Sequence, residues 1–238
     1  MKKGLLEQII SRGYWRINFQ PVSINIRNNS LLNLEAIVKK NTVELRGWDF
    51  PHIPRRNDQN GKIIHHSTYI EAWEDYSMYK EFWRMYQSGQ FLSYRGLRED
   101  WFESNHLSPQ MALKIKPKEY LGVLFSVIYE LTEIFVFSSR LSLDGLYDEG
   151  IVINIQLKNL SGRKLWLEDN NRIPFLFPKT ISDAEFSFSE TYTKDNIINN
   201  YQIFARDIIM QLFERFDWNP SQDLIIHEQN NLLSGKVL

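Results

Sequence analysis

Alternation of apolar and polar residues predicts β-strands in several parts of the chain, because successive side chains of a strand point to opposite faces. The clearest case is residues 151–157, Ile-Val-Ile-Asn-Ile-Gln-Leu, which place apolar residues on one face. Residues 82–87 and 90–97 flank Ser88 and Gly89 and predict the two arms of a hairpin. Further strands are expected in residues 13–27 with a break at Pro21, and in residues 42–48, 165–166 and 184–191.

Other segments show the spacing of three and four residues that is typical of helices. Apolar residues recur at this spacing after Ser30, which predicts an N-capped helix that ends at Asn41. Residues 119–139 are apolar on nearly every side, as expected for a buried helix. Residues 195–216 combine an apolar stripe with a charged face, and they predict an amphipathic helix as the last element of the chain.

Residues 68–97 allow two interpretations, because their Trp and Tyr residues also fall at helical intervals. Strands are favoured, since Trp, Tyr and Phe have high strand preference. Together the segments predict an α+β fold with a mixed or antiparallel sheet, a buried central helix and an amphipathic C-terminal helix. We expect a single domain over residues 1–238, with a subdivision near residue 105 as the alternative.

Composition narrows the function classes. The 28 basic residues nearly balance the 29 acidic residues, which gives no global attraction to nucleic acid or anionic membranes. The absence of cysteine excludes disulfides, thiolate metal sites and cysteine nucleophiles. The N-terminus lacks the apolar core and cleavage site of a secretory signal, so we expect a cytoplasmic protein.

One segment, residues 120–137, is almost long and apolar enough to span a membrane. It contains Glu130 and Glu133, and each ionised carboxylate would cost roughly 2.5–3.5 kcal/mol at the centre of a bilayer. We therefore expect a buried helix of a protein that does not enter the membrane.

The most informative local motif is Leu-Arg-Gly-Trp-Asp-Phe-Pro-His at residues 45–52, which begins a region holding four of the seven tryptophans. It places Arg46, Asp49 and His52 within seven residues at a predicted strand end, where functional sites are common. One interpretation is that His52 acts as a general base oriented by Asp49. The other is structural: Asp49 caps the turn, Arg46 pairs with a carboxylate, and the aromatic residues fill the core.

Other polar residues give weaker indications. The carboxylates Glu71, Glu74 and Asp75, with Glu99 and Asp100, could bind Mg²⁺ in a hydrolase or nuclease. His65 and His66 point apart if they lie in a strand, and no nucleotide-binding loop is present, so no metal site and no cofactor are expected. Basic residues near aromatic ones could bind nucleic-acid phosphates, or form a solvated edge: Arg55, Arg56, Lys114, Lys116 and Lys118.

Four motifs together resemble a family of uncharacterised bacterial proteins: Gly-Tyr-Trp-Arg at 13–16, the motif at 45–52, Phe-Trp-Arg-Met-Tyr-Gln-Ser-Gly-Gln-Phe at 82–91, and Leu-Phe-Glu-Arg-Phe-Asp-Trp at 212–218. In this family a similar region sometimes follows a Schlafen-like, Alba-type DNA-binding domain. We expect no such domain before Gly13. The resemblance implies a sensor, adaptor or partner-binding subunit of a bacterial regulatory or phage-defence system, and it implies no chemical activity.

These observations favour a non-catalytic protein-interaction module, an accessory or scaffold subunit that binds a protein partner. Trp, Tyr and Arg concentrate binding energy at protein interfaces. The candidates for such a face or its support are Arg46, Trp48, Asp49, His52, Trp83 and Arg84. Nucleic-acid binding is the alternative function, and a metal-dependent hydrolase or nuclease is the third. The sequence leaves the partner and the oligomeric state open.

Overall fold

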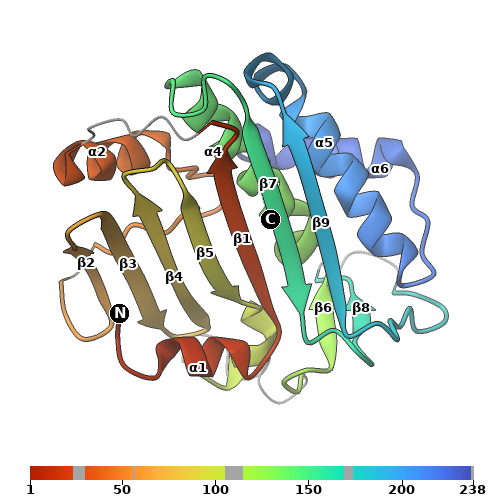
Figure 1. The fold of residues 1–238 in the computed structure, drawn as a ribbon. Coiled ribbons are helices and arrows are strands. Elements are labelled where there is room, and N and C mark those ends of the chain that lie inside the picture. The colour runs from red at the N-terminus through yellow and green to blue at the C-terminus, as the bar shows by residue number, and fades with distance from the viewer. Residues whose placement is uncertain (24–29, 56, 105–114, 169–173, 237–238) are drawn as a thin grey trace.

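The computed structural model describes residues 1–23, 30–55, 57–104, 115–168 and 174–236. Its centre is a seven-stranded sheet in which every neighbouring pair of strands is antiparallel. The strands follow the order β2 (Gly61–His65), β3 (Tyr69–Tyr76), β4 (Tyr79–Tyr86), β5 (Phe91–Gly96), β1 (Tyr14–Pro21), β7 (Ile151–Lys158) and β9 (Glu185–Tyr192) (Figure 1). A small second sheet pairs β6 (Tyr120–Gly122) with β8 (Lys164–Trp166) in parallel.

The longer helices lie on one face of the large sheet, the far side in Figure 1. The helical elements are α1 (Leu5–Ile10), α2 (Leu31–Asn41), the 3₁₀-helix η1 (Arg98–Ser104), the π-helix η2 (Leu124–Tyr129), α4 (Glu130–Leu143), α5 (Lys194–Glu214) and α6 (Gln222–Leu233). η2 runs directly into α4, so the two form one continuous helix behind the middle of the sheet.

The main core lies between the sheet and these helices. Strand alternation builds its floor, because every second residue of β7, from Ile151 to Leu157, is buried. β1 contributes Trp15, Ile17 and Phe19 to the same face. α4 covers them with apolar side chains on nearly all sides, and residues from both sides of residue 105 belong to this one cluster.

The opposite face of the sheet carries a smaller cluster. Leu5 and Ile9 of α1 pack on Trp73 and Phe82, which alternate with the core-facing residues of β3 and β4. α1 crosses only the lower end of the strands in Figure 1, and Trp101 of η1 packs beside Lys80 on the same face. Most of this face is therefore a polar surface.

The structure confirms the predicted α+β class, the antiparallel sheet, the buried central helix and the amphipathic helix near the C-terminus. The strand interpretation of residues 68–97 is correct, and β4 and β5 form the hairpin around Ser88 and Gly89. The cap of α2 is also as predicted, since the Ser30 side chain accepts a hydrogen bond from the Asn33 amide at 3.2 Å.

The strand predicted for residues 42–48 does not form. Val43 and Phe50 exchange two backbone hydrogen bonds, of 2.8 and 2.9 Å, as an isolated bridge. The chain between them folds into a loop that turns at Gly47, whose φ of 78° is a conformation that favours glycine. The apolar residues of this segment are drawn into separate tertiary contacts, so their alternation does not produce a strand.

Two helix predictions also need correction. The central helix begins at Leu124 and not near residue 119, because Tyr120–Gly122 pairs with β8 instead. The helix predicted for residues 195–216 is present as α5, but it is not the last element. α6 follows it, begins after the N-cap Ser221, and buries Ile225 and Leu232. The predicted strand over residues 13–27 is found as β1 up to Pro21, and residues 24–29 lie outside the described residues.

A buried ion pair fixes several chain segments to each other. The Arg163 guanidinium donates two hydrogen bonds to the Asp100 carboxylate, at 2.9 and 2.5 Å, and both side chains are almost fully buried. The same carboxylate accepts the backbone amides of Gly13 and Lys118 at 2.7 Å each. Arg163 also donates to the carbonyl of Tyr120. The pair therefore joins the start of β1, η1 and the small sheet.

We expect Arg163→Met to lower the free energy of unfolding by about 3–5 kcal/mol, because it leaves the Asp100 carboxylate buried without its cation. Urea unfolding measures the change. Lys194→Met is the matched control, since Lys194 pairs with Asp148 at the surface and such pairs contribute about 1 kcal/mol or less. Similar unfolding energies for both variants would show that the Arg163 pair does not hold the fold.

Candidate functional site

The 45–52 motif lies beside the core-facing side of β3, β4 and β5, next to the start of the central helix. The Val43–Phe50 bridge closes the loop at its base, and the turn at Gly47 directs Arg46 and Trp48 inward. Past the bridge, the Asp49 carboxylate accepts a hydrogen bond from the Ile53 amide at 3.0 Å. This local bond fixes the chain at His52.

Arg46 is buried against two carboxylates of α4. Its Nη2 donates to Glu130 and to Glu133 at 2.7 Å each, and its Nε lies 3.0 Å from both oxygens of Glu133. Its Nη1 donates to the Phe125 carbonyl at 2.6 Å. Burial raises the pKa of Glu133 to about 7, although the adjacent Arg46 acts to lower it. The structural interpretation of Arg46, pairing with a carboxylate, is thus what the structure shows.

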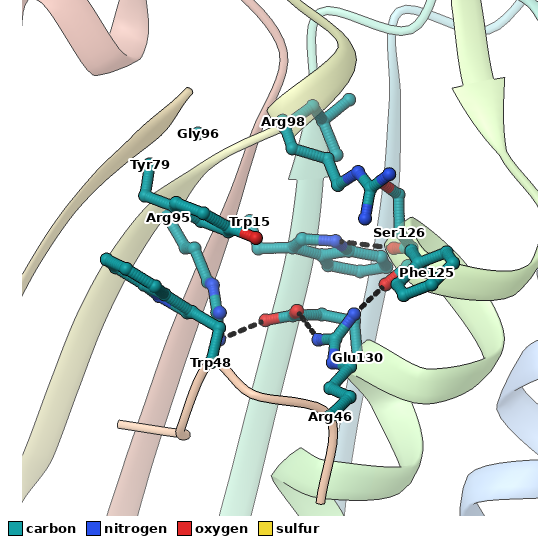
Figure 2. Close-up of a pocket in the computed structure, with 11 residues that line it drawn as sticks. Trp15, Arg46, Trp48, Tyr79, Arg95, Gly96, Arg98, Phe125, Ser126 and Glu130 are labelled. Carbon is teal, nitrogen blue, oxygen red and sulfur yellow. Dashed lines mark hydrogen bonds and ion pairs between the residues drawn. The ribbon is translucent and has the colours of Figure 1, made fainter. Parts of the chain in front are cut away.

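Arg95 of β5 is the second buried guanidinium of the cluster. Its Nη1 lies 3.1 Å from the free oxygen of Glu130, and its Nε lies 3.6 Å from Glu81. The first distance is short, but the groups are not aligned for a hydrogen bond, and Nη1 has no hydrogen-bond partner in the described structure. Burial raises the pKa of Glu81, and Arg95 offsets part of this effect. Figure 2 shows the Glu130 carboxylate between the two arginines.

Trp48 stands between two stacked rings. His52 lies on one side at 3.9 Å between ring centroids and Tyr79 on the other at 3.7 Å, with interplanar angles of 10° and 6°. The indole Nε1 donates to Glu81 at 2.6 Å. Both faces and the polar edge of Trp48 are therefore held, while the side chain as a whole is only half-buried.

His52 is held between two carboxylates. One ring nitrogen hydrogen bonds to Asp49, and the other lies 3.5 Å from Glu74. Burial acts to lower the pKa of His52, but the hydrogen bonds to Asp49 and Glu74 raise it to about 9. The imidazole is therefore protonated at neutral pH and acts as a buried cation. The structure therefore has the contact between Asp49 and His52 that the sequence predicted, and a role of His52 as a general base stays a prediction.

The remaining two candidates lie outside this cluster of side chains. Trp83 is 1% exposed, and its Nε1 donates to the His52 carbonyl at 2.7 Å, so it supports the site from the core. Arg84 follows it in β4 and points to the opposite face of the sheet, where its Nε pairs with Glu71 at 2.7 Å. The structure therefore brings together Arg46, Trp48, Asp49 and His52, with Trp83 beneath them and Arg84 apart.

Two cavities adjoin Trp48. The first, which we call the arginine cavity, measures about 40 Å³ and is lined chiefly by Arg46, Arg95, Arg98, Trp48, Tyr79 and Phe125 (Figure 2). The second, which we call the histidine cavity, measures about 230 Å³ and is lined chiefly by Trp48, Asp49, His52, Arg55, Glu74 and Tyr76. Trp48 is common to both and forms a partition between them.

Several residues of the site were not among those predicted from the sequence: Tyr79, Glu81, Arg95, Arg98 and Glu130. The usable signal was the pair Glu130 and Glu133 within an otherwise apolar helix. Buried carboxylates require a cation or hydrogen-bond donors, so their presence in a buried helix predicts a basic partner facing them. Which arginine meets them depends on the tertiary fold.

The predicted carboxylate pairs are engaged in separate contacts. Asp75 pairs with Lys80, Glu99 accepts from the Ser126 hydroxyl at 2.6 Å, and Asp100 pairs with Arg163. Within the described residues, no group of three or more His, Asp or Glu side chains could hold a metal ion. His65 pairs with Glu35 at 2.5 Å, away from His66, which stacks on Tyr69.

Of the predicted basic stretch, Lys116 and Lys118 are exposed, as is Arg55. Lys114 and Arg56 lie outside the described residues. In the part of the chain that the structure covers, no helix has the length and apolarity needed to cross a membrane.

Comparison with known proteins found no protein-family model, no curated protein and no solved structure that matches this chain. The family resemblance of the four motifs therefore stays a prediction.

The protonated state of His52 predicts a pH dependence of stability. Its folded pKa, about 9, is above the ordinary value of 6.5, so its contribution is complete below pH 6.5 and is lost as the pH rises through about 9. The full shift corresponds to about 3 kcal/mol. The pKa of Glu133 is raised from 4.5 to about 7, so its contribution is lost as the pH rises from 4.5 to about 7. The fall in stability between pH 7 and pH 9 therefore reports mainly on His52.

Urea unfolding at several pH values measures this slope, and His52→Gln is expected to remove it. His227→Gln is the matched control, because His227 is exposed on α6. A slope that is the same in His52→Gln and in the unsubstituted protein would contradict the assignment.

Proposed function

We propose that the protein is a non-catalytic interaction module, an accessory or scaffold subunit that binds a protein partner. Its binding face is the Trp48 surface, which we define as the accessible parts of Trp48, Tyr76, Tyr79, Arg98 and Phe125. Tyr76 is 46% exposed and the other four side chains are half-buried. A bacterial regulatory or phage-defence complex is the setting that the motif resemblance implies.

The observation that carries this proposal is the fixed position of a half-buried tryptophan at the surface. Trp48 is stacked on both faces and bonded through Nε1, so it gives up little freedom when a partner covers it. Aromatic residues and arginine at the centre of a patch are the usual sites of strong interface contacts. Tyr76 and Tyr79 face each other across the β3–β4 turn and extend the same patch.

The buried charges beneath the surface support a role in binding. Arg46 donates hydrogen bonds to both Glu130 and Glu133 and ties the loop to α4. These bonds hold the surface residues in place before a partner arrives.

A second candidate function is nucleic-acid binding, which the exposed Lys116 and Lys118 favour. The uncovered sheet face adds Arg16, whose Nε donates to the Tyr94 hydroxyl at 3.1 Å beside the stacked rings of Tyr14 and Tyr94. Phosphate-driven affinity falls steeply with added salt, whereas an aromatic protein interface responds modestly. A salt titration of binding therefore separates the two functions.

The interaction proposal is tested by capturing the tagged protein from its host at native expression level and physiological salt after nuclease treatment. We expect a stoichiometric protein companion, identified by mass spectrometry. Tyr76→Ala and Tyr79→Ala are each expected to weaken its affinity by tenfold or more, as loss of an interface aromatic contact does.

Phe177→Ala is the matched control, because Phe177 is 74% exposed and lies outside the Trp48 surface. It should leave the affinity unchanged. Equal affinity of all three variants for the companion would place the interface elsewhere, and capture of the protein alone would count against an accessory role.

A further inference from the structure

A buried guanidinium at the arginine cavity is paired with Glu130 without the geometry of a hydrogen bond. Arg95 is 7% exposed at its side chain, and its Nη1 makes no hydrogen bond in the described structure. Leaving a buried charged donor without an acceptor is unfavourable by several kcal/mol in general. The cavity beside it is where an acceptor can be supplied.

Arg98 contributes a second available guanidinium. Its charge acts on the Glu168 carboxylate, whose pKa burial raises and Arg98 helps to lower, and its guanidinium carbon lies 4.2 Å from the centre of the Phe125 ring. Figure 2 shows Arg98 reaching toward Phe125 and Ser126, with Arg95 on another side of the same cavity. Two guanidinium groups therefore converge on the space from different strand and helix elements.

The third arginine does not compete for the same role. Arg46 is already bonded to Glu130, Glu133 and the Phe125 carbonyl. Glu130 is the acidic residue that lines the cavity, and its Oε1 also has no hydrogen-bond partner among the described residues. Its other oxygen is bound to Arg46, so this one carboxylate is shared between Arg46 and Arg95.

The size of the cavity limits what can enter. The cavity volume of about 40 Å³ corresponds to roughly three waters or one small tetrahedral or planar ion. The aromatic walls, Trp48, Tyr79 and Phe125, reduce the access of water and strengthen charge interactions inside. A larger ligand could place only a terminal group here, with its remaining atoms over the Trp48 surface.

We propose that the arginine cavity is a binding site for a small oxyanion, a phosphate or carboxylate group held by Arg95 and Arg98. Guanidinium groups match these anions because their paired N–H donors meet two oxygens at once. The bound oxygens give Nη1 of Arg95 a hydrogen-bond acceptor and place an anion beside Arg98.

This site does not depend on the proposed protein partner, so it can be tested with the isolated protein. Inorganic phosphate and acetate are titrated separately at constant ionic strength, and the tryptophan indole N–H signals are followed by NMR. The Trp15 indole donates to the Ser126 carbonyl and the Trp48 indole to Glu81, both at the cavity wall. We expect these two signals to shift saturably, and the Trp218 indole, which packs on Phe175 and Phe213, to stay unchanged.

Arg98→Gln is expected to weaken anion binding, which raises the dissociation constant at least tenfold. Arg84→Gln is the matched control, because Arg84 lies on the opposite face of the sheet. Tighter binding of phosphate than of acetate assigns a phosphate group as the ligand, and the reverse order assigns a carboxylate. Shifts that do not saturate, shifts of equal size for all tryptophans, or equal affinity in Arg98→Gln would overturn the proposal and leave a cavity filled by water.

The NMR titration of the unsubstituted protein tests anion binding in the arginine cavity even if Arg98→Gln fails to fold. Its outcome is also distinct from that of the interaction experiment. Loss of the partner in Tyr76→Ala leaves anion binding unaffected if both proposals hold, since Tyr76 lines the histidine cavity and not the arginine cavity.

Discussion

Two carboxylates on the inner side of the central helix, Glu130 and Glu133, constrain much of the surrounding structure. Both are almost fully buried, and such groups persist in a core only with cations and hydrogen-bond donors around them. Arg46 reaches them from the loop after α2, and Arg95 reaches Glu130 from the sheet. The helix, the loop and the sheet therefore cannot shift relative to each other without leaving a charge unpaired.

The properties of the candidate site follow from this constraint. With Arg46 fixed, Trp48 can lie only a short distance away, between His52 and Tyr79. Asp49 and Glu74 then face His52 and raise its pKa, which favours a third positive charge in the cluster. A site assembled from charges that neutralise each other is suited to holding a surface in a defined shape.

Sequence patterns predicted those features that arise from neighbouring residues. The cap at Ser30, the β4–β5 hairpin and the alternation of β7 are local, and all three are present. The motif at 45–52 was found because its polar residues lie close together in the chain. The strand expected there does not form because Arg46 and Trp48 hydrogen bond to partners on α4 and β4. The sequence prediction also missed α6, although Ser221 and the apolar residues after it have the pattern of a capped helix. Arg95 and Arg98 became site residues only through tertiary structure.

The order of strands in the sheet has a consequence for how the chain is made. β1 is the first strand of the structure, yet it lies between β5 and β7, with Tyr14 opposite both Gly96 and Lys158. On the ribosome it has no partner strand until β5 emerges, and one of its edges stays open until β7 follows. Contacts so distant in sequence form late. Throughout that interval the apolar face of Trp15, Ile17 and Phe19 lacks its cover, which makes this segment prone to aggregation during synthesis.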